Sequence, residues 1–402
     1  MSVPNAAPAP ASPLRALLPF GALSASYFAH IGFFNPYLPL WLKDLGLPLL
    51  AISLLTSAQS LTRLFAPYVW GALSDRTGER VRLMRYSATA ALVLSCGLWW
   101  PEGGVFWLGA VLLLMFSHTS AMMPMSEAAM AHLVSQGGQF DARRYGRVRL
   151  WGSLGFLLTV FAAGSWFEGF GMGHFPGWTL FTLLAVVGST WWLPDHREAV
   201  PHARDEHLPV WPVLRQAEVR WFFASIFFHV LSHVSLYVFF SLYLDSLGYS
   251  KAVIGLLWAV SVVVEVSWFF TQSRWLPRWP LTVWLLLCGL VMAVRMGFTA
   301  AFGASLAVLL VVQCVHALTF AAHHTACIAL VSHYFPARLR GRGQALFTVI
   351  GYGLSGVTGG LGGGYLAKAF GLSSVYWAAC AMALLGSACA WRLYRLAHHL
   401  RA

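Results

Sequence analysis

The chain has 402 residues, of which 58% are hydrophobic and only 10% charged, and its formal net charge is +12. Soluble chains carry about 25% charged residues, so the composition excludes a soluble domain and indicates a polytopic membrane protein. The basic excess comes with no nucleic-acid-binding motif, so we attribute it to membrane topology and contact with anionic lipid.

Twelve apolar stretches have the length of about 20 residues that is needed to cross about 30 Å of hydrocarbon. We therefore predict an all-α membrane protein with twelve transmembrane helices, at residues 15–41, 47–71, 83–100, 105–134, 142–167, 176–193, 219–244, 251–273, 280–302, 304–334, 341–368 and 372–394. The first stretch is too long for a cleaved signal peptide. The Pro/Ala-rich residues 1–14 are expected to form a disordered cytoplasmic N-terminus.

Several features inside these spans predict how the helices pack. Asn35-Pro36 and Pro124 are expected to kink their helices. The segment "GYGLSGVTGGLGGG" (351–364) has the small-residue spacing that lets helices approach closely. The six cysteines show no CxxC spacing, which favours small packing residues over a disulfide or a metal site.

Arginine is concentrated in the loops at one end of the predicted bundle, including Arg76–Arg85, Arg143–Arg149 and Arg338–Arg342. The opposite loops hold only three basic residues, Lys43, Lys251 and Lys368. We call these two sides the arginine-rich end and the arginine-poor end. By the positive-inside rule, the arginine-rich end and both termini are predicted to be cytoplasmic.

The chain also contains an internal repeat. The segment "LWLKDLGLPLLAISLL" (40–55) aligns with "LYLDSLGYSKAVIGLL" (242–257) at an offset of 202 residues. An offset of six spans predicts two halves of the same orientation, a six-helix bundle at 15–193 and another at 219–394. A cytoplasmic linker at 194–218 joins them, and a cytoplasmic tail follows at 395–402. Parallel halves place a substrate site between them near mid-membrane and predict alternating access.

The loop "GALSDRTGERVR" (71–82) resembles the signature loop of the major facilitator superfamily. Gly71, Asp75, Arg76, Gly78 and Arg80 stand at the matching positions. The resemblance implies two six-helix bundles and an inter-helix latch that helps to set the balance of inward and outward states. The alternative is a solvated turn whose arginines serve topology alone.

The segment "YGRVRLWGSLGF" (145–156), preceded by "PMSE" (124–127), is similar to the lactose-permease branch of that superfamily, and most of all to its phenylpropionate-permease group. "PYLPLWLKDLG" (36–46) and "QCVHALTF" (313–320) extend the similarity over most of the chain. The resemblance implies a monomeric proton symporter of aromatic acids in a bacterial inner membrane.

Two opposite charges lie at equal depth in neighbouring spans, Glu127 and Arg149. A mid-membrane charge costs about 2.5–3.5 kcal/mol unless it has a partner or a water-filled cavity, so equal depth predicts that the two pair. The resemblance implies that Arg149 binds substrate, that Glu127 is the partner which substrate displaces, and that Phe156 stacks on it. The alternative is a structural salt bridge or a snorkelling arginine. Arg63, at the repeat position of Glu265, either faces the same cavity or snorkels.

The second half holds three further ionisable residues inside its spans, Glu265, Arg295 and His316. By resemblance, they match positions that link substrate and proton. Gln313 and Thr319 stand where the branch carries a Lys and its proton-carrying Glu. The usual carrier is therefore missing, and proton coupling would fall to Glu265 or His316. The alternative for His316 is a hydrogen-bonded core histidine.

Histidines recur at helical spacing in the second half. His229, His233 and Tyr237 share one face of the seventh predicted helix, and His316 and His323 share one face of the tenth. We assign His233 and Tyr237 to substrate binding and the others to the cavity wall or a proton relay. Hydrogen bonding between helices is the alternative. No metal site is expected, because carboxylate or Cys partners are not close by.

Together these features predict a secondary transporter that takes up a small aromatic or organic carboxylate, similar to 3-phenylpropionate, with protons. The proton gradient supplies the energy without a cofactor, and the partners are the small-molecule substrate, the proton and the lipid bilayer. The alternative cargo is a sugar or a nucleoside. From another class, the alternative is a non-transporting membrane sensor. An enzyme is not expected, because the spans show no nucleophile–base or metal constellation.

Overall fold

The computed structural model describes residues 13–130, 135–136, 139–140, 142–195, 209–335 and 339–399. The disorder predicted for the N-terminus and most of the predicted linker lie outside these residues. The regular structure of the described chain is helical except for one short antiparallel hairpin, in which β1 (Ser135–Gln136) pairs with β2 (Gln139–Phe140). The predicted all-α membrane class is confirmed.

Helices of the first half are α1 (Pro13–Asp44), α2 (Leu49–Thr62), α3 (Ala66–Thr77), α4 (Arg80–Ser95), α5 (Gly104–Thr119), α6 (Met122–Met130), α7 (Ala142–Phe170) and α8 (Phe175–Trp192). Those of the second half are α9 (Trp211–Leu214), α10 (Ala217–Val234), α11 (Phe240–Ser246), α12 (Lys251–Trp275), α13 (Leu281–Phe302), α14 (Leu306–Cys314), α15 (His323–Tyr334), α16 (Arg340–Leu346), α17 (Ser355–Phe370) and α18 (Leu372–His399). Three π-helical segments interrupt the second half, at Ser235–Phe239, Ala317–Ala322 and Phe347–Leu354.

Ten helical segments of the described chain are long and apolar enough to cross a membrane, and each coincides with a predicted span. The other two predicted spans, 83–100 and 176–193, correspond to α4 and α8. α4 has only 16 residues and begins with arginines, and α8 has only 18 residues. Both are therefore shorter than the length of about 20 residues that a membrane crossing needs. Both nevertheless pack within the first bundle, α4 against α5 and α8 against α1.

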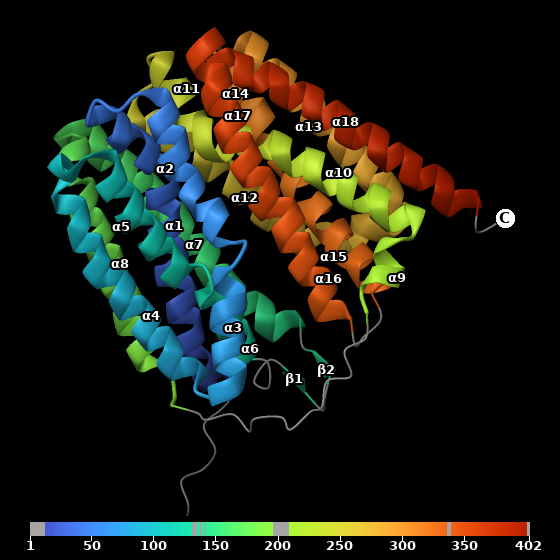
Figure 1. The fold of residues 1–402 in the computed structure, drawn as a ribbon, viewed down its shortest axis with the longest axis horizontal. Coiled ribbons are helices and arrows are strands. Elements are labelled where there is room, and N and C mark those ends of the chain that lie inside the picture. The colour runs from blue at the N-terminus through green and yellow to red at the C-terminus, as the bar shows by residue number, and fades with distance from the viewer. Residues whose placement is uncertain are drawn as a thin grey trace, which may run out of the picture.

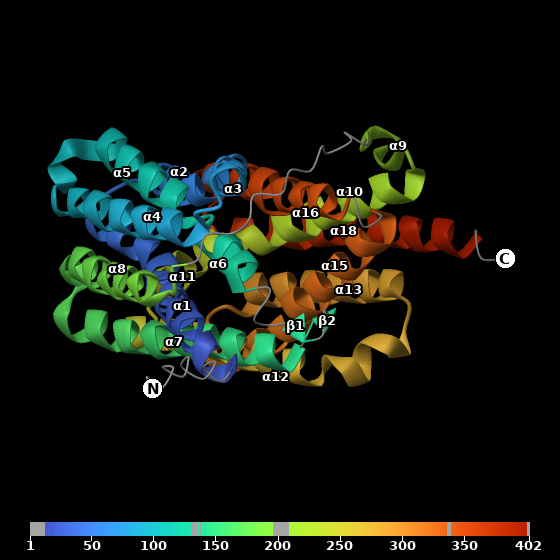
Figure 2. The same ribbon diagram turned by 90° about the horizontal axis from the view of Figure 1, so that it is seen from below.

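The two bundles lie side by side, with the first half in blue to green and the second in yellow to red (Figures 1 and 2). The repeat is visible in the helix starts, because α2 begins at Leu49 and α12 at Lys251, which are 202 residues apart. The most extensive contacts between the halves are those of α2 with α17 and of α7 with α12.

Pro124 interrupts the fourth predicted span. α5 ends at Thr119 and α6 begins at Met122, so the break falls where the proline ring excludes the carbonyl of residue 120 from a regular helix. Beyond the break, α6 runs in a different direction from α5 (Figure 2) and packs against α4 of the same bundle. α1, by contrast, continues through Pro36 as one helix.

Glycines hold α17 against α2 across the boundary between the halves. A Cβ added at Gly360 would overlap the hydroxyl of Ser57, and one at Gly364 would overlap that of Ser53. Any larger residue at either glycine would push the helices apart. The prediction that this glycine-rich stretch serves helix packing is therefore confirmed.

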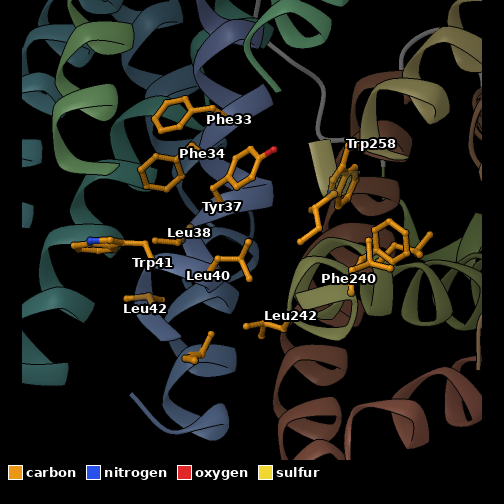
Figure 3. Close-up of a cluster of buried hydrophobic side chains, with 14 of the residues drawn as sticks. Phe33, Phe34, Tyr37, Leu38, Leu40, Trp41, Leu42, Phe240, Leu242 and Trp258 are labelled. Carbon is orange, nitrogen blue, oxygen red and sulfur yellow. The ribbon is translucent and has the colours of Figure 1, made fainter. Parts of the chain in front are cut away.

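The apolar cores show at which end the halves are joined. One continuous cluster near the arginine-poor end contains Phe34 of α1 together with Phe240 of α11 and Trp258 of α12 (Figure 3). Near the arginine-rich end, the first half has its own core among α1, α4 and α6, and the second has another among α10, α13 and α15. Apolar contact between the halves is thus concentrated at the arginine-poor end.

Polar contacts between the halves reinforce the apolar contact at the arginine-poor end. The Lys43 ammonium donates to the Asp245 carboxylate at 2.6 Å, and the backbone N–H of Lys251 donates to the Glu168 carboxylate at 2.7 Å. The Tyr37 hydroxyl, which points from α1 towards the second half in Figure 3, lies 3.2 Å from the Lys251 carbonyl. Lys43 and Asp245 are repeat-equivalent, and equivalent positions of a two-fold arrangement meet at its axis. The ion pair therefore marks that axis.

Candidate substrate and proton site

The signature loop forms the turn between α3 and α4 at the arginine-rich end. Gly78 ends α3 with a φ of 66°, a left-handed conformation that favours glycine. Arg80 Nη2 donates to Asp75 Oδ1 at 3.0 Å, and the Asp75 side chain is 71% exposed. Arg76 is exposed, and a Cβ at Gly71 would meet open space. In this state the loop joins α3 to α4, and its role as a conformational latch stays a prediction.

Arg149 lies where α7 packs closely on α1. A Cβ at Gly152 would lie 2.6 Å from the Phe28 ring, so the glycine is what allows this ring to approach α7. The Arg149 guanidinium lies over the Phe28 ring, with 4.3 Å between Cζ and the ring centroid, in cation–π geometry. Arg149 is partly buried and interacts electrostatically with His324 of α15. It therefore faces the second half.

Glu127 does not form the predicted pair with Arg149 in this structure. Its side chain is exposed on α6, and the ion pairs of the described residues include none between these two within 4.0 Å. The prediction expected a kink at Pro124 but still took the number of residues from the cytoplasmic end of each helix as the depth of both charges. The break before Pro124 places Glu127 on a separate helix, so its distance along the chain no longer fixes its position.

Arg63 follows α2 at the turn before α3 and also faces the second half. Its Cζ lies 5.9 Å from the ring centroid of Tyr352, in a π-helical segment of that half. Tyr27 of α1 lies within electrostatic range of both Arg63 and Arg149, so the two cations share one neighbourhood. Within the described chain, neither arginine has a carboxylate within 4.0 Å. This position favours the cavity-facing interpretation of Arg63.

Phe156 lies two turns beyond Arg149 on α7. Its side chain is partly buried and packs against the core cluster that both halves share. Its backbone lies against α1, since a Cβ at Gly32 would be 2.7 Å from the Phe156 carbonyl oxygen. Stacking of this ring on a substrate stays a prediction.

Arg295 of α13 is 2% exposed, and its hydrogen-bond partners are all neutral. Nη1 donates to His316 Nδ1 at 3.0 Å and to Thr319 Oγ1 at 2.8 Å, and Nη2 donates to Gln313 Oε1 at 2.6 Å. Such bonds are needed to offset the desolvation of a buried charge. Gln313 and Thr319, where the sequence departs from the lactose-permease branch, thus serve to hold Arg295.

The contacts of His316 fix which of its nitrogens carries the proton. A guanidinium only donates, so Nδ1 of His316 accepts from Arg295, and the ring proton is assigned to Nε2. Nε2 faces Glu265, whose Oε2 lies 3.6 Å away. The Glu265 side chain is 17% exposed. Arg295, His316 and Glu265 therefore form one chain of contacts that ends at a partly exposed carboxylate.

The two predicted histidine faces meet. The rings of His229 and His323 stack with centroids 3.6 Å apart and an interplanar angle of 8°. The His233 ring lies 4.7 Å from that of Tyr237 and 5.4 Å from that of His316. α10 and α15 are therefore joined by imidazoles at the level of the Arg295 network.

All three π-helical segments contribute to this cluster. They supply Tyr237, Thr319 with Phe320, and Tyr352. π-helical turns are frequent at functional sites, because the extra residue re-aims side chains. Sequence reasoning missed Phe320, Tyr352 and Phe28, since no local pattern separates them from the many other aromatic residues of these spans.

Two parallel helical halves with charged and aromatic side chains facing one another between them define a multi-pass membrane transporter rather than an enzyme. A family model described as the MFS_1 like family matches residues 24–378. The chain belongs to this family of major facilitator superfamily (MFS) secondary transporters, and the superfamily expected from the signature loop is confirmed.

Relatives agree with this assignment. The chain is 27% identical over 370 residues to the "Probable 3-phenylpropionic acid transporter" of Escherichia coli (strain K12), covering 89% of this chain and 93% of the relative. It is 28% identical over 368 residues to the maltose permease of Geobacillus stearothermophilus, covering 87% of each. Among solved structures, the nucleoside transporter NupG superposes with a TM-score of 0.81 at 14% identity, covering 94% of this chain and 99% of NupG. The xylose transporter XylE from E. coli superposes with a TM-score of 0.73 at 14% identity, covering 94% and 96%.

Proposed function

We propose that this MFS transporter takes up a small aromatic or other organic carboxylate together with protons. The observation that carries the proposal is the pair Arg63 and Arg149, which both lie within electrostatic range of Tyr27 and have no carboxylate within 4.0 Å among the described residues. Two partly buried cations in one neighbourhood repel each other, so an anion bound between them is attracted by both. The planar guanidinium also matches the geometry of a carboxylate.

Aromatic rings support an aromatic acid in particular. Phe28 lies under Arg149 and Tyr352 under Arg63, so each cation already rests on a ring face. A neutral sugar or nucleoside would leave both cations uncompensated, which is the physical reason for placing those cargoes second. The relative named as a 3-phenylpropionic acid transporter fits this order, and the maltose permease relative makes sugar the competitor to test.

Glu265 is the proton carrier in this proposal. A second proton on His316 would have to bind Nδ1, which already accepts from Arg295, so protonation there would break that bond. Glu265 carries no such restriction and faces Nε2 of the same ring. His316 therefore positions the carrier, and Glu265 takes up and releases the proton.

The proposal also includes the orientation of the chain in the membrane. With the arginine-rich end in the cytoplasm of a bacterial plasma membrane, the state described here is closed to the outside by the shared core and the Lys43–Asp245 pair. The separate cores at the other end then correspond to an inward-facing state.

Uptake into proteoliposomes tests the cargo. Wild-type protein should accumulate labelled 3-phenylpropionate and not maltose. Arg149→Lys should lower the rate about tenfold or more, because hydrogen bonds to a charged group are worth about 1.5–3 kcal/mol. Arg147→Gln, an exposed arginine two residues earlier on α7, is the matched control and should keep normal uptake. Normal uptake by Arg149→Lys would remove that residue from the site, and uptake of maltose alone would replace the carboxylate.

A second assay tests the coupling. Adding substrate to vesicles that contain a pH-sensitive dye should move protons with the wild-type protein. It should not with Glu265→Gln, although substrate exchange across the membrane should continue. Glu102→Gln, which alters an exposed acid at the arginine-poor end, is the control. Proton movement that persists in Glu265→Gln would reject Glu265 as the carrier.

A further inference from the structure

A small cavity lies in the second half beside the proposed substrate site. Its wall includes His229, His233, Tyr237, Phe320 and Tyr352, which come from α10 and the three π-helical segments. The space accommodates about one water molecule or one hydroxyl group, and is too small for a whole aromatic ring. The cavity is therefore suited to a substituent of a larger ligand.

One polar atom in this wall has no partner. His233 is 3% exposed, and its Nε2 makes no hydrogen bond with any residue that the structure describes. A buried polar atom left in this way is costly, and nearly all such atoms in proteins are satisfied. Tyr237 lies beside it, with the two ring centroids 4.7 Å apart. The unsatisfied nitrogen marks the point where a ligand would bind.

The neighbouring polar groups are already occupied. His229 Nε2 donates to the Thr319 carbonyl at 2.8 Å. The Tyr352 hydroxyl is hydrogen-bonded to His324 Nδ1 at 3.2 Å. Because these groups are satisfied by the protein itself, they leave His233 Nε2, beside Tyr237, to bind a ligand.

The cavity adjoins the arginines that would hold a carboxylate. Tyr352 lines the cavity and also lies under the Arg63 guanidinium, 5.9 Å from Cζ to the ring centroid. Tyr237 interacts electrostatically with both Tyr352 and Arg63. An aromatic acid whose carboxylate binds at Arg63 would therefore extend along Tyr352, with the far edge of its ring towards His233.

We infer that this cavity is a subsite for a hydroxyl group on the aromatic ring of the substrate, and that His233 is the residue that recognises it. The inference deepens the proposed function and rests on it: the substrate class becomes hydroxylated aromatic carboxylates. A hydroxyl donates and accepts, so it pairs with Nε2 in either tautomer of His233. An acid without the hydroxyl leaves this nitrogen to a water molecule, so discrimination is modest rather than absolute.

Calorimetric binding to the purified full-length protein tests the subsite with three probes, 3-phenylpropionate, 3-(3-hydroxyphenyl)propionate and 3-(4-hydroxyphenyl)propionate. One of the hydroxylated acids should bind about five- to tenfold more tightly than the parent acid. His233→Phe keeps a flat ring and removes the nitrogens, so the ratio of affinities should fall to about one. His233→Gln, which restores a hydrogen-bonding group, should recover part of the ratio. His333→Phe changes an exposed histidine on α15 and should leave the ratio as in the wild type.

The outcomes separate this inference from the proposed function. The readout is the ratio of the affinities of one protein for the hydroxylated and the parent acid. A loss of affinity that affects all three acids equally therefore leaves this ratio unchanged. Equal binding of all three acids by the wild-type protein, or an unchanged ratio in His233→Phe, overturns the subsite alone. Binding of maltose and of none of the acids overturns the proposed function instead.

Discussion

Lys43 and Asp245 close the arginine-poor end, and removing either charge should favour the state that is open there. The two side chains belong to different halves, so their contact at 2.6 Å exists only while the halves meet at this end. We expect Lys43→Ala and Asp245→Ala each to shift the equilibrium towards opening. The charge-swapped variant Lys43→Asp with Asp245→Lys should return it towards the wild-type position.

The size of the shift follows from the exposure of the pair. The Lys43 side chain is 46% exposed and that of Asp245 22%, so solvent screens the attraction between them. Such pairs are worth about 0.2–1 kcal/mol, which corresponds to a change of about 1.4- to 5-fold in the ratio of the two states. The shared apolar core and the contact between Glu168 and the Lys251 N–H remain, so the closed state should persist in every variant.

Distances between two spin labels measure this ratio. Labels at Gly173→Cys and Ser246→Cys would report on exposed positions of the two halves at the arginine-poor end, after the six free cysteines have been replaced. Each alanine variant should increase the long-distance population, and the charge swap should reverse the increase. Lys368→Ala, an exposed lysine at the same end, is the control. Identical populations in all variants, or an equal shift in Lys368→Ala, would refute the reasoning.

Further predictions concern packing and the buried arginine network. Gly360→Val should lower the melting temperature of the purified protein, because the added atoms overlap α2 and overpacking costs about 1–3 kcal/mol, whereas Gly362→Val meets open space and should not. Equal melting of these two variants would contradict the packing argument. Thr319→Val keeps the shape but leaves one Arg295 hydrogen bond unmade, which should cost about 1–3 kcal/mol in the same assay. The exposed Thr358→Val should be neutral, and a neutral Thr319→Val would show that the bond contributes nothing.

Spans and repeats were predictable because they depend on properties local to the chain. Apolar length decides whether a helix can cross the membrane, and the offset of 202 residues between the repeats reappears in the starts of α2 and α12. The same offset separates Lys43 from Asp245. Their opposite charges at equal repeat positions were visible in the alignment, although the sequence alone does not show that both lie at the axis.

The pairing of Glu127 with Arg149 was not predictable in the same way. Pro124 indicated a break, but the direction of the chain beyond a break depends on packing with distant segments. The number of residues from a helix end gives the depth of a side chain in the membrane only while the helix is straight. α6 turns away from α5, and Arg149 rests on the ring of Phe28 of α1 instead.

The neutral partners of Arg295 show a similar limit. The sequence identified Gln313 and Thr319 as departures from the lactose-permease branch, and the missing Glu suggested a missing function. In the structure both side chains accept hydrogen bonds from Arg295. Their role depends on the π-helical turn at Ala317–Ala322, whose formation is decided by tertiary contacts rather than by local propensity.

Opposite charges at equal repeat positions occur twice, at the arginine-poor end and again at the site. Arg63 and Glu265 are related by the same offset as Lys43 and Asp245, yet they are not within 4.0 Å of each other in this state. Both instead interact electrostatically with Tyr352. On the proposed function, a substrate carboxylate neutralises Arg63 while a proton neutralises Glu265. Arg149 keeps its charge in either case, so the carboxylate and the proton neutralise the two repeat-related positions rather than the whole site. The carboxylate and the proton would therefore act at two repeat-related positions that both face Tyr352, and so on the same closing movement of the halves.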